Sequence, residues 1–169
     1  DNGRIRKTRT EAADLSVLPL PAYDPEIYSA LSDDSAKLRI FEVEESRGCP
    51  RLCYSCSRTT TERWMRPRPV RLVCDEVRRL QGWYGAVAFR FSDITASGAA
   101  HAGSTSLALL RQGIAITSSR HLHVCANATE VFPSLFTSGC RVMTFYVDTG
   151  SQRLLEDCFG KTTGVTLIE

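Results

Sequence analysis

The chain has 169 residues, of which 43% are hydrophobic, and this is enough for one globular domain with a substantial core. Its 21 basic and 19 acidic residues are mostly interspersed, so the composition gives no signature of a broad nucleic-acid-binding face. No run approaches the roughly 18 apolar residues of a membrane span, and the first residues lack the pattern of a secretory signal, so a cytoplasmic protein is expected.

The first 36 residues are polar and show no clear periodicity. Within them the segment LPLPAYD contains two prolines, which favour an extended course of the chain. We therefore expect residues 1–36 to be a linker or an arm, followed by a domain formed by residues 37–169. That domain begins with LRIFEVEES, an alternating run that indicates a strand. Its apolar positions are Leu38, Ile40 and Val43.

Helical and strand-like patterns alternate through the rest of the chain. Behind Pro69, a first helix is predicted from an apolar stripe at helical spacing, formed by Val70, Val73, Val77 and Leu80. The segments that follow are the strand AVAFRF, a weaker helix marked by Leu107, Leu110 and Ile114, a strand within IAITSSRHLHVCAN, a helix with the stripe Val131, Phe132, Leu135 and Phe136, the strand RVMTFYVD, and a helix from Ser151 as N-cap to Gly160.

Glycines precede successive strands at nearly constant spacing, at Gly85, Gly113 and Gly139. The repeated strand-and-helix unit predicts an α/β fold, a partial (βα) barrel of parallel strands with about four βα units. In such a fold the loops after the carboxyl ends of the strands gather on one face, where sites are built. The cysteine-rich loop after the first strand and the segments SDITAS, CANAT and DTGS are therefore expected to be neighbours.

Three of the seven cysteines lie within the loop RGCPRLCYSCSR. An odd number of cysteines without an export signal argues against a disulfide framework. Cys49, Cys53 and Cys56 follow the pattern C-x3-C-x2-C, and three thiolates can hold three irons of a cubane cluster while the fourth iron stays open. Zinc and an unligated loop of packed thiols remain as alternatives. The other four, expected to pack as small apolar residues, are Cys74, Cys125, Cys140 and Cys158.

Several residues near these motifs have more than one interpretation. The loop arginines, which either offset the negative charge of a cluster or are solvated, are Arg47, Arg51 and Arg58. Glu76 on the first helix is expected to face solvent, whereas Trp64 and Met65 are expected to pack on the core or to shield the cysteine loop. His121 and His123 point the same way on a strand, and we expect surface or satisfied core groups rather than metal ligands.

Taken together, these motifs resemble the radical S-adenosylmethionine (SAM) superfamily. SRGCPRLCYSC is similar to its cluster loop, VCDEVRRL to its first helix, AVAFRFSDI to its second strand, and GCRVMTFYVDTGSQRLLEDCFGK to its fourth strand and following helix. The LPLPAYD arm resembles the segment that follows the cobalamin-binding domain in the B12-binding branch. The resemblance covers about residues 16–163.

The resemblance implies a 4Fe-4S cluster on Cys49, Cys53 and Cys56, whose open iron chelates SAM. One electron then cleaves SAM to methionine and a 5'-deoxyadenosyl radical, for methyl transfer or another functionalisation of a C–H bond. The residues that it places near SAM are Tyr54, Ser55, Ser92, Asp93, Asp148 and Ser151. For Asp93 and Asp148 the alternative is that they only cap their turns. The family usually has an aromatic residue at the position of Ser55 and glutamate at that of Asp148.

The resemblance also implies a reductant such as flavodoxin or ferredoxin, and a small-molecule or macromolecular substrate that the sequence does not specify. The family's barrel usually has six βα units and this chain provides about four, so a partner or a second copy is expected to cover the open edge. Nothing in the chain resembles the cobalt-ligand loop of cobalamin domains, so cobalamin is not supported by this chain. The alternative is a noncatalytic iron–sulfur or zinc-binding module from a truncated or degenerate relative.

Overall fold

In the computed structural model, the described residues are 12–31, 40–49, 53, 54, 56, 64–92, 98–122 and 128–160. They include a four-stranded sheet in the order β1-β4-β5-β6, in which each neighbouring pair is parallel. The strands are β1 (Ile40–Val43), β4 (Ala88–Phe91), β5 (Thr117–Leu122) and β6 (Cys140–Phe145). The predicted α/β fold, with helices alternating with the parallel strands, is confirmed.

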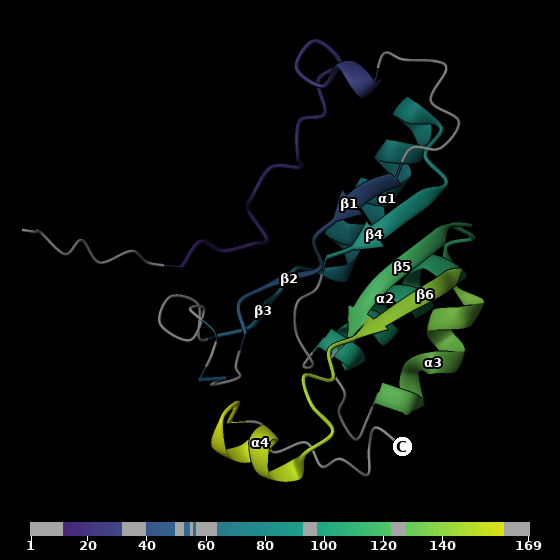
Figure 1. The fold of residues 1–169 in the computed structure, drawn as a ribbon. Helices are drawn as coiled ribbons and strands as arrows, with labels where there is room; N and C mark the ends of the chain where they lie inside the picture. The colour runs from purple at the N-terminus through teal and green to yellow at the C-terminus, as the bar shows by residue number, and fades with distance from the viewer. Residues whose placement is uncertain are drawn as a thin grey trace, which may run out of the picture.

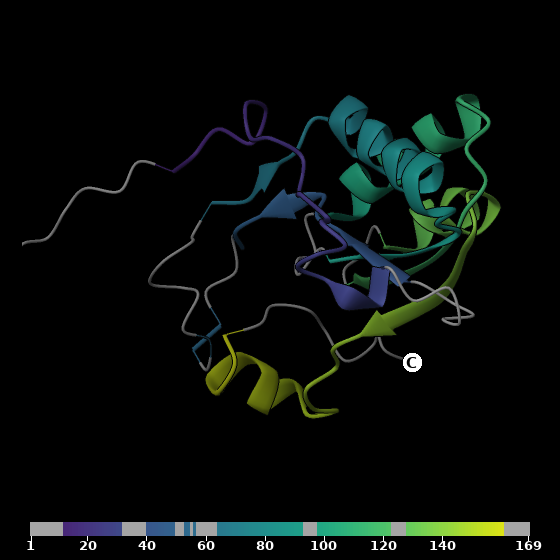
Figure 2. The same ribbon diagram turned by 90° about the horizontal axis from the view of Figure 1, so that it is seen from above.

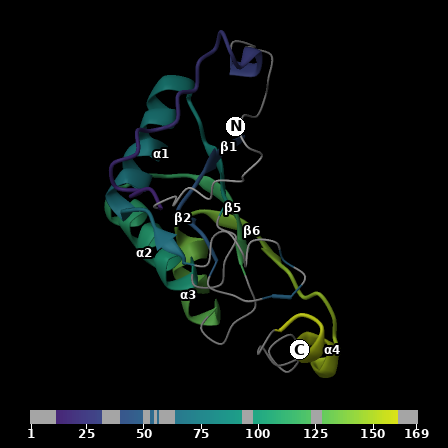
Figure 3. The ribbon, with the colours of Figure 1, turned by 90° about the vertical axis from the view of Figure 1, so that its left-hand side faces the viewer.

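Three helices cover one face of the sheet, α1 (Val70–Tyr84), α2 (Gly98–Arg111) and α3 (Ala128–Thr137). Figures 2 and 3 show them side by side on that face, and among the described residues no helix covers the other. Beyond the carboxyl ends of the strands lie α4 (Gln152–Asp157) and a ribbon of β2 (Ser46–Arg47) and β3 (Arg66–Pro67) (Figure 1). A single turn of 3-10 helix, η1, occupies Ser29–Leu31. None of the described helices is long and apolar enough to cross a membrane.

The first helix has the bounds that its sequence pattern predicted. It begins after Pro69, whose φ of −52° is already close to the helical value. Val73, Val77 and Leu80 are buried on its inner side. It ends at Gly85, which adopts the left-handed conformation with φ 60° and donates its N–H to carbonyls of the last turn. This is a position at which glycine is favoured, because other residues are strained at positive φ.

The main core lies between α1 and the first two strands. Phe41 and Val43 of β1 pair in register with Phe89 and Phe91 of β4, and all four side chains are buried. Because side chains alternate along a strand, Ile40 points to the opposite face and is exposed. The predicted strand is therefore present, with Phe41 and Val43 facing the core and Ile40 facing away from it.

The second helix buries small and polar side chains instead of the predicted leucine stripe. Leu107 is exposed, and Ile114 is buried but lies beyond the end of the helix. The buried positions are Ala102, Gly103, Thr105, Ser106 and Leu109. A Cβ atom on Gly103 would lie 3.1 Å from Cγ1 of Val131 on α3, so the two helices approach closely there. Small residues permit this spacing, which is why the hydrophobic pattern of α2 is weak.

The third strand and third helix correspond to the predicted segments with two differences. β5 occupies Thr117–Leu122, in the middle of the predicted segment 114–127. On α3, Leu135 is buried and Val131 and Phe132 are half-buried, but Phe136 is exposed. The guanidinium of Arg141 lies over the Phe136 ring, 4.7 Å from its centroid. The predicted stripe is therefore correct for three of its positions and wrong for Phe136.

The residues before the sheet contact the domain at several points. Leu15 is buried, and Tyr23 packs against Phe41 with 5.3 Å between ring centroids. The Tyr23 hydroxyl donates to the carbonyl of Glu42 (3.0 Å), and the Tyr84 hydroxyl donates to the carbonyl of Tyr23. The segment LPLPAYD thus lies along α1 and β1. The predicted boundary between residues 36 and 37 lies outside the described residues and stays a prediction.

Candidate functional site

The cysteine loop begins directly after β1 and is closed at its base by the ribbon. Ser46 pairs with Pro67 and Arg47 with Arg66 in antiparallel register. Gly48 follows, buried and with φ 90°, a conformation that bends the chain as it enters the loop and that favours glycine. Cys49 is the next residue. Pairing between residues so far apart in the chain returns the end of the loop to its start, at the carboxyl end of the sheet (Figure 1).

The three cysteines of the motif are half-buried, and none of them forms a disulfide. The N–H of Cys56 donates to the carbonyl of Cys53 (3.0 Å), so the last two cysteines share a turn. Within the described part of the chain, no three or more His, Cys, Asp or Glu side chains are grouped closely enough to hold one metal ion. This does not conflict with a cluster, because each thiolate of a cubane binds a different iron and the sulfurs need not converge on one point.

Several predicted positions lie outside the described residues, namely Leu38, Arg51, Ser55, Arg58, Asp93, His123 and Cys125. Of the aromatic residues around the loop, Tyr54 is 72% exposed and Trp64 is 81% exposed. The expectation that Trp64 packs on the core was therefore wrong, whereas Met65 is half-buried. Shielding of the loop, most of which lies outside the described residues, stays a prediction. Arg47 forms an ion pair with Glu44 (2.8 Å) at a partly exposed site, so its charge is offset by a carboxylate within the protein.

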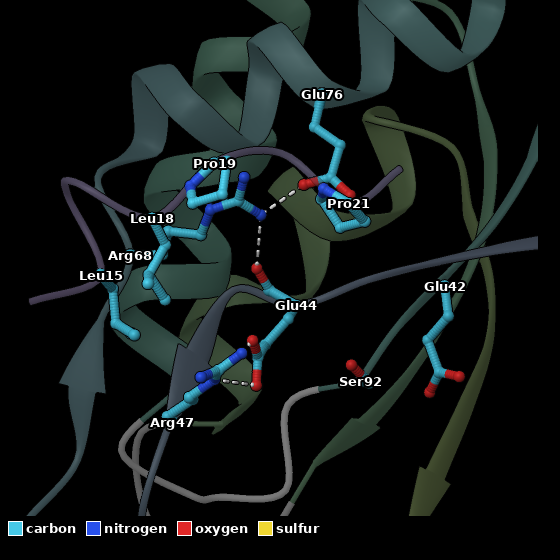
Figure 4. A pocket seen from close by; sticks show the side chains of 10 residues that line it. All are labelled: Leu15, Leu18, Pro19, Pro21, Glu42, Glu44, Arg47, Arg68, Glu76 and Ser92. Atoms are coloured by element: carbon cyan, nitrogen blue, oxygen red, sulfur yellow. Dashed lines mark hydrogen bonds and ion pairs between the residues drawn. The ribbon is translucent and has the colours of Figure 1, made fainter. Parts of the chain in front are cut away.

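Ser92 lies at the carboxyl end of β4, where its N–H continues the ladder by donating to the carbonyl of Val43 (3.1 Å). It lines a cavity of about 120 Å³ together with Glu42, Glu44 and residues of the arm (Figure 4). Pockets for whole drug-sized ligands are typically about 300–1,000 Å³. At about 120 Å³ this cavity is therefore smaller than a site for a whole drug-sized ligand.

The turn after β6 contains the other two predicted SAM-contacting residues. Asp148 is exposed and has φ 60°, a left-handed conformation that is uncommon for residues other than glycine. Such conformations cluster at functional sites, although aspartate tolerates them in ordinary turns. Ser151 accepts a hydrogen bond from the N–H of Leu154 (3.4 Å), as predicted for the N-cap of the last helix. The Ser151 hydroxyl therefore already serves as the N-cap of α4.

Two buried ion pairs lie under the base of the cysteine loop, and the sequence did not predict them. Glu45 and Arg120 are 0% and 2% exposed and form one pair. Glu76 and Arg68 form the other, so the prediction that Glu76 faces solvent was wrong. Burial raises the pKa of the Glu76 carboxyl, and the hydrogen bond and charge of Arg68 partly oppose this shift.

The uncovered face of the sheet carries further polar residues. Glu42, Arg90 and Ser119 are neighbours across three strands, which places opposite charges side by side. Nearer the carboxyl edge, Nδ1 of His121 and the hydroxyl oxygen of Tyr146 are 2.7 Å apart. The interpretation of His121 as a satisfied group is consistent with this contact. The sequence contained a signal for this row of polar residues. Side chains alternate along β1, so Glu42 lies on the opposite face of the sheet from Phe41 and Val43.

Two curated proteins that are similar to this chain are both named methyltransferases. No protein-family model matches the chain. It is 28% identical to a cytidylyl-2-hydroxyethylphosphonate methyltransferase of Streptomyces wedmorensis, over 95% of this chain and 32% of that protein. It is 27% identical to an uncharacterised methyltransferase of Pyrococcus horikoshii, over 92% of this chain and 34% of that protein. The chain thus spans about a third of the length of these curated relatives.

Among solved structures, the radical S-adenosylmethionine methyltransferase TsrM of Kitasatospora setae, with cobalamin and a [4Fe-4S] cluster bound, matches 69% of this chain with a TM-score of 0.63 and 19% identity. The match covers 24% of TsrM. The same enzyme with tryptophan and a SAM analogue bound matches with a TM-score of 0.62. This chain is thus distantly similar over most of its length to two curated methyltransferases, and its fold matches part of the radical SAM methyltransferase TsrM. These similarities agree with the resemblance that the motifs suggested.

Proposed function

We propose that this chain is part of a radical SAM enzyme that uses a 4Fe-4S cluster on Cys49, Cys53 and Cys56. The observation that carries the proposal is the loop itself, in which three half-buried cysteines outside any disulfide follow a strand of a parallel sheet. Its homologues are named methyltransferases, so methyl transfer is the reaction outcome that we favour. The substrate is left open, because the chain spans only about a third of these relatives.

A bound cluster would supply one electron to SAM and thereby release a 5'-deoxyadenosyl radical. The protein's own residues orient the cosubstrate. Ser92 and the carboxylate of Glu42 line a cavity at the carboxyl edge, where acceptor oxygens suit the ammonium end of an amino acid, whereas Glu44 in the same lining is already paired with Arg47. We assign Asp148 to the ribose or amino-acid part of SAM, and Tyr54 and Ser55 to the region of the adenine. A reductant of the flavodoxin or ferredoxin type completes the proposal.

A noncatalytic iron–sulfur or zinc-binding module is the second candidate. Two observations favour it, namely the high exposure of Tyr54 and the use of the Ser151 hydroxyl in a helix cap. In this interpretation neither Tyr54 nor Ser151 is positioned to contact a nucleotide. Cobalamin stays outside both proposals for this chain, because the sequence has no segment that resembles its ligand loop. The expectation that a partner or a second copy covers the sheet edge at β6 stays a prediction.

Anaerobic reconstitution with iron and sulfide separates the candidates. Our proposal predicts a brown protein whose reduced cluster gives an electron paramagnetic resonance (EPR) spectrum that changes when SAM is added, and formation of 5'-deoxyadenosine. Cluster assembly without cleavage of SAM would favour the noncatalytic module. Stoichiometric zinc without iron would contradict the cluster altogether.

Matched cysteine variants test the ligand set. Cys49→Ala, Cys53→Ala and Cys56→Ala should each abolish assembly of a stable cluster. Cys158→Ala is the control, because this cysteine is exposed near the end of α4 and belongs to no motif. Iron content equal to that of the unmodified chain in any of the first three variants would overturn the assignment.

A further inference from the structure

We propose that the two buried ion pairs, Glu45–Arg120 and Arg68–Glu76, position the start of the cysteine loop and thereby the metal site. The inference rests on the proposed function, since it concerns how the three cysteines are presented. Arg120, Arg68 and Glu76 act on the site through the backbone and are positioning residues.

The first pair joins the end of β1 to the end of β5. Glu45 and Arg120 are both buried, and the Arg120 guanidinium lies over the ring of Phe91, 3.9 Å from its centroid. In the sheet, Arg120 is in register with Phe91, which is in register with Val43, so its side chain reaches across β4 toward the segment that leaves β1. Glu45 is thus held from the sheet side.

The second pair holds the carbonyls of Glu44 and Glu45 from the side of helix α1. The backbone N–H of Arg68 donates to the carbonyl of Glu45 (2.7 Å), and its guanidinium donates to the carbonyl of Glu44 (3.2 Å). The same guanidinium forms the ion pair with Glu76 on α1 (Figure 4). Two consecutive carbonyls are therefore fixed by one arginine, which is itself fixed by a helix.

Energetics favour a positional role over a purely stabilising one. Oε1 of Glu45, Oε1 of Glu76 and Nε of Arg120 are buried and have no hydrogen-bond partner. Burying charged groups is costly, and replacing a buried ion pair with apolar side chains of similar size is often neutral or stabilising. What an apolar pair cannot supply is a directional bond that sets where residues 44 and 45 lie. Four residues later the chain reaches Cys49, with the ribbon and Gly48 between.

The test compares three versions of the chain. Arg120→Met breaks the first pair and leaves a buried carboxylate, so it should unfold more easily. The double variant Glu45→Leu/Arg120→Met removes both charges and should recover most of the lost stability. We expect it to fold but to exchange the amide hydrogens of residues 44–49 about tenfold faster in the iron-free protein. After reconstitution, its iron content should be lower and its EPR spectrum altered.

The exposed pair Arg71–Asp75 on α1 provides the matched control. Arg71→Gln/Asp75→Asn should change neither amide exchange nor iron content. Our inference is wrong if the folded apolar double variant has the amide exchange and the EPR spectrum of the unmodified chain. Failure of the proposed function would give a different result, because the unmodified chain would then bind no iron. The comparison of amide exchange rates would still decide whether the ion pairs position the loop.

Discussion

Gly139, at the turn between α3 and β6, lies against the backbone of Ile116, just before β5. A Cβ atom built on Gly139 would stand 1.8 Å from the carbonyl oxygen of Ile116. The glycine also has φ 101°. Both facts result from one arrangement, in which the chain must turn tightly over the start of β5 before it pairs with that strand.

Gly139→Ala should therefore destabilise the protein by about 3 kcal/mol or more, because the methyl group collides with backbone and the residue is strained at positive φ. Urea denaturation followed by circular dichroism measures the change. Gly82→Ala on α1 is the matched control, since nothing lies within 4 Å of the added Cβ. It should stabilise the chain by about 0.5–1 kcal/mol. Similar effects in both variants would contradict this account.

Removing one partner of the Arg68–Glu76 pair should cost more than removing both. Arg68→Met leaves the Glu76 carboxylate buried without its partner, and we expect a loss of about 3–5 kcal/mol in the free energy of unfolding. Arg68→Met/Glu76→Leu should recover most of that loss. Equal stability of the single and double variants would show that the pair is not coupled.

The pH dependence of the same site has a defined sign. Burial raises the pKa of Glu76 above its ordinary value of 4.5. The folded state therefore holds the proton more tightly than the unfolded state, and the stability from this group is lost as the pH rises through the raised pKa. Stability of Arg68→Met should increase as the pH falls from neutral toward 4.5. The double variant Arg68→Met/Glu76→Leu, which lacks the carboxyl, should lose this component of the pH dependence.

Attachment of the arm should weaken at high pH. Burial, together with the negative charges of Glu76 and Glu42, raises the pKa of Tyr23 from 10.0 to about 12. Because the folded state favours the neutral phenol, the stability from Tyr23 is complete below pH 10 and is lost as the pH rises toward 12. Tyrosinate absorbance should show a late-titrating phenol that is absent in Tyr23→Phe. An identical titration of the two proteins would contradict the prediction.

The cysteines outside the motif should differ in reactivity. Cys158 is exposed, so the expectation that it packs as an apolar residue was wrong, whereas Cys74 and Cys140 are buried as predicted. Burial raises the pKa of the Cys74 and Cys140 thiols and excludes reagents from them. Alkylation of the native chain, mapped by mass spectrometry, should modify Cys158 first. Modification of Cys140 at the rate of Cys158 would show that β6 opens readily.

The sequence was sufficient for elements whose signals are local. The stripe of α1 and the glycine that ends it lie within 16 residues, and both appear in the structure as predicted. The predictions failed where the packing does not depend on a stripe of large hydrophobic residues. On α2 the buried surface is formed by small and polar residues such as Ala102 and Thr105, which no hydrophobic period marks.

For the candidate site, the cysteine motif was visible because its spacing is local, whereas the pairs beneath it connect distant residues. Glu45 follows the alternation of Phe41 and Val43, and Glu76 stands three residues after Val73, so each carboxylate already lay in phase with a buried face. This phase is a sequence signal for buried carboxylates. The partners Arg120 and Arg68 could not be inferred, because only the folded sheet and ribbon bring them to these positions.

The position of the cysteines within the topology links the metal to folding. Ile40 of β1 pairs with Ala88 of β4, and this closes a longer crossover than the later pairings of Ala88 with Thr117 and Ser118 with Cys140. Closing a longer loop costs more chain entropy, which makes the joining of β1 to the sheet a slow step. All three cysteines lie inside that crossover, so a cluster that binds only the folded chain would add its binding free energy to the joining of β1, and the loaded chain should unfold at a higher denaturant concentration than the iron-free chain.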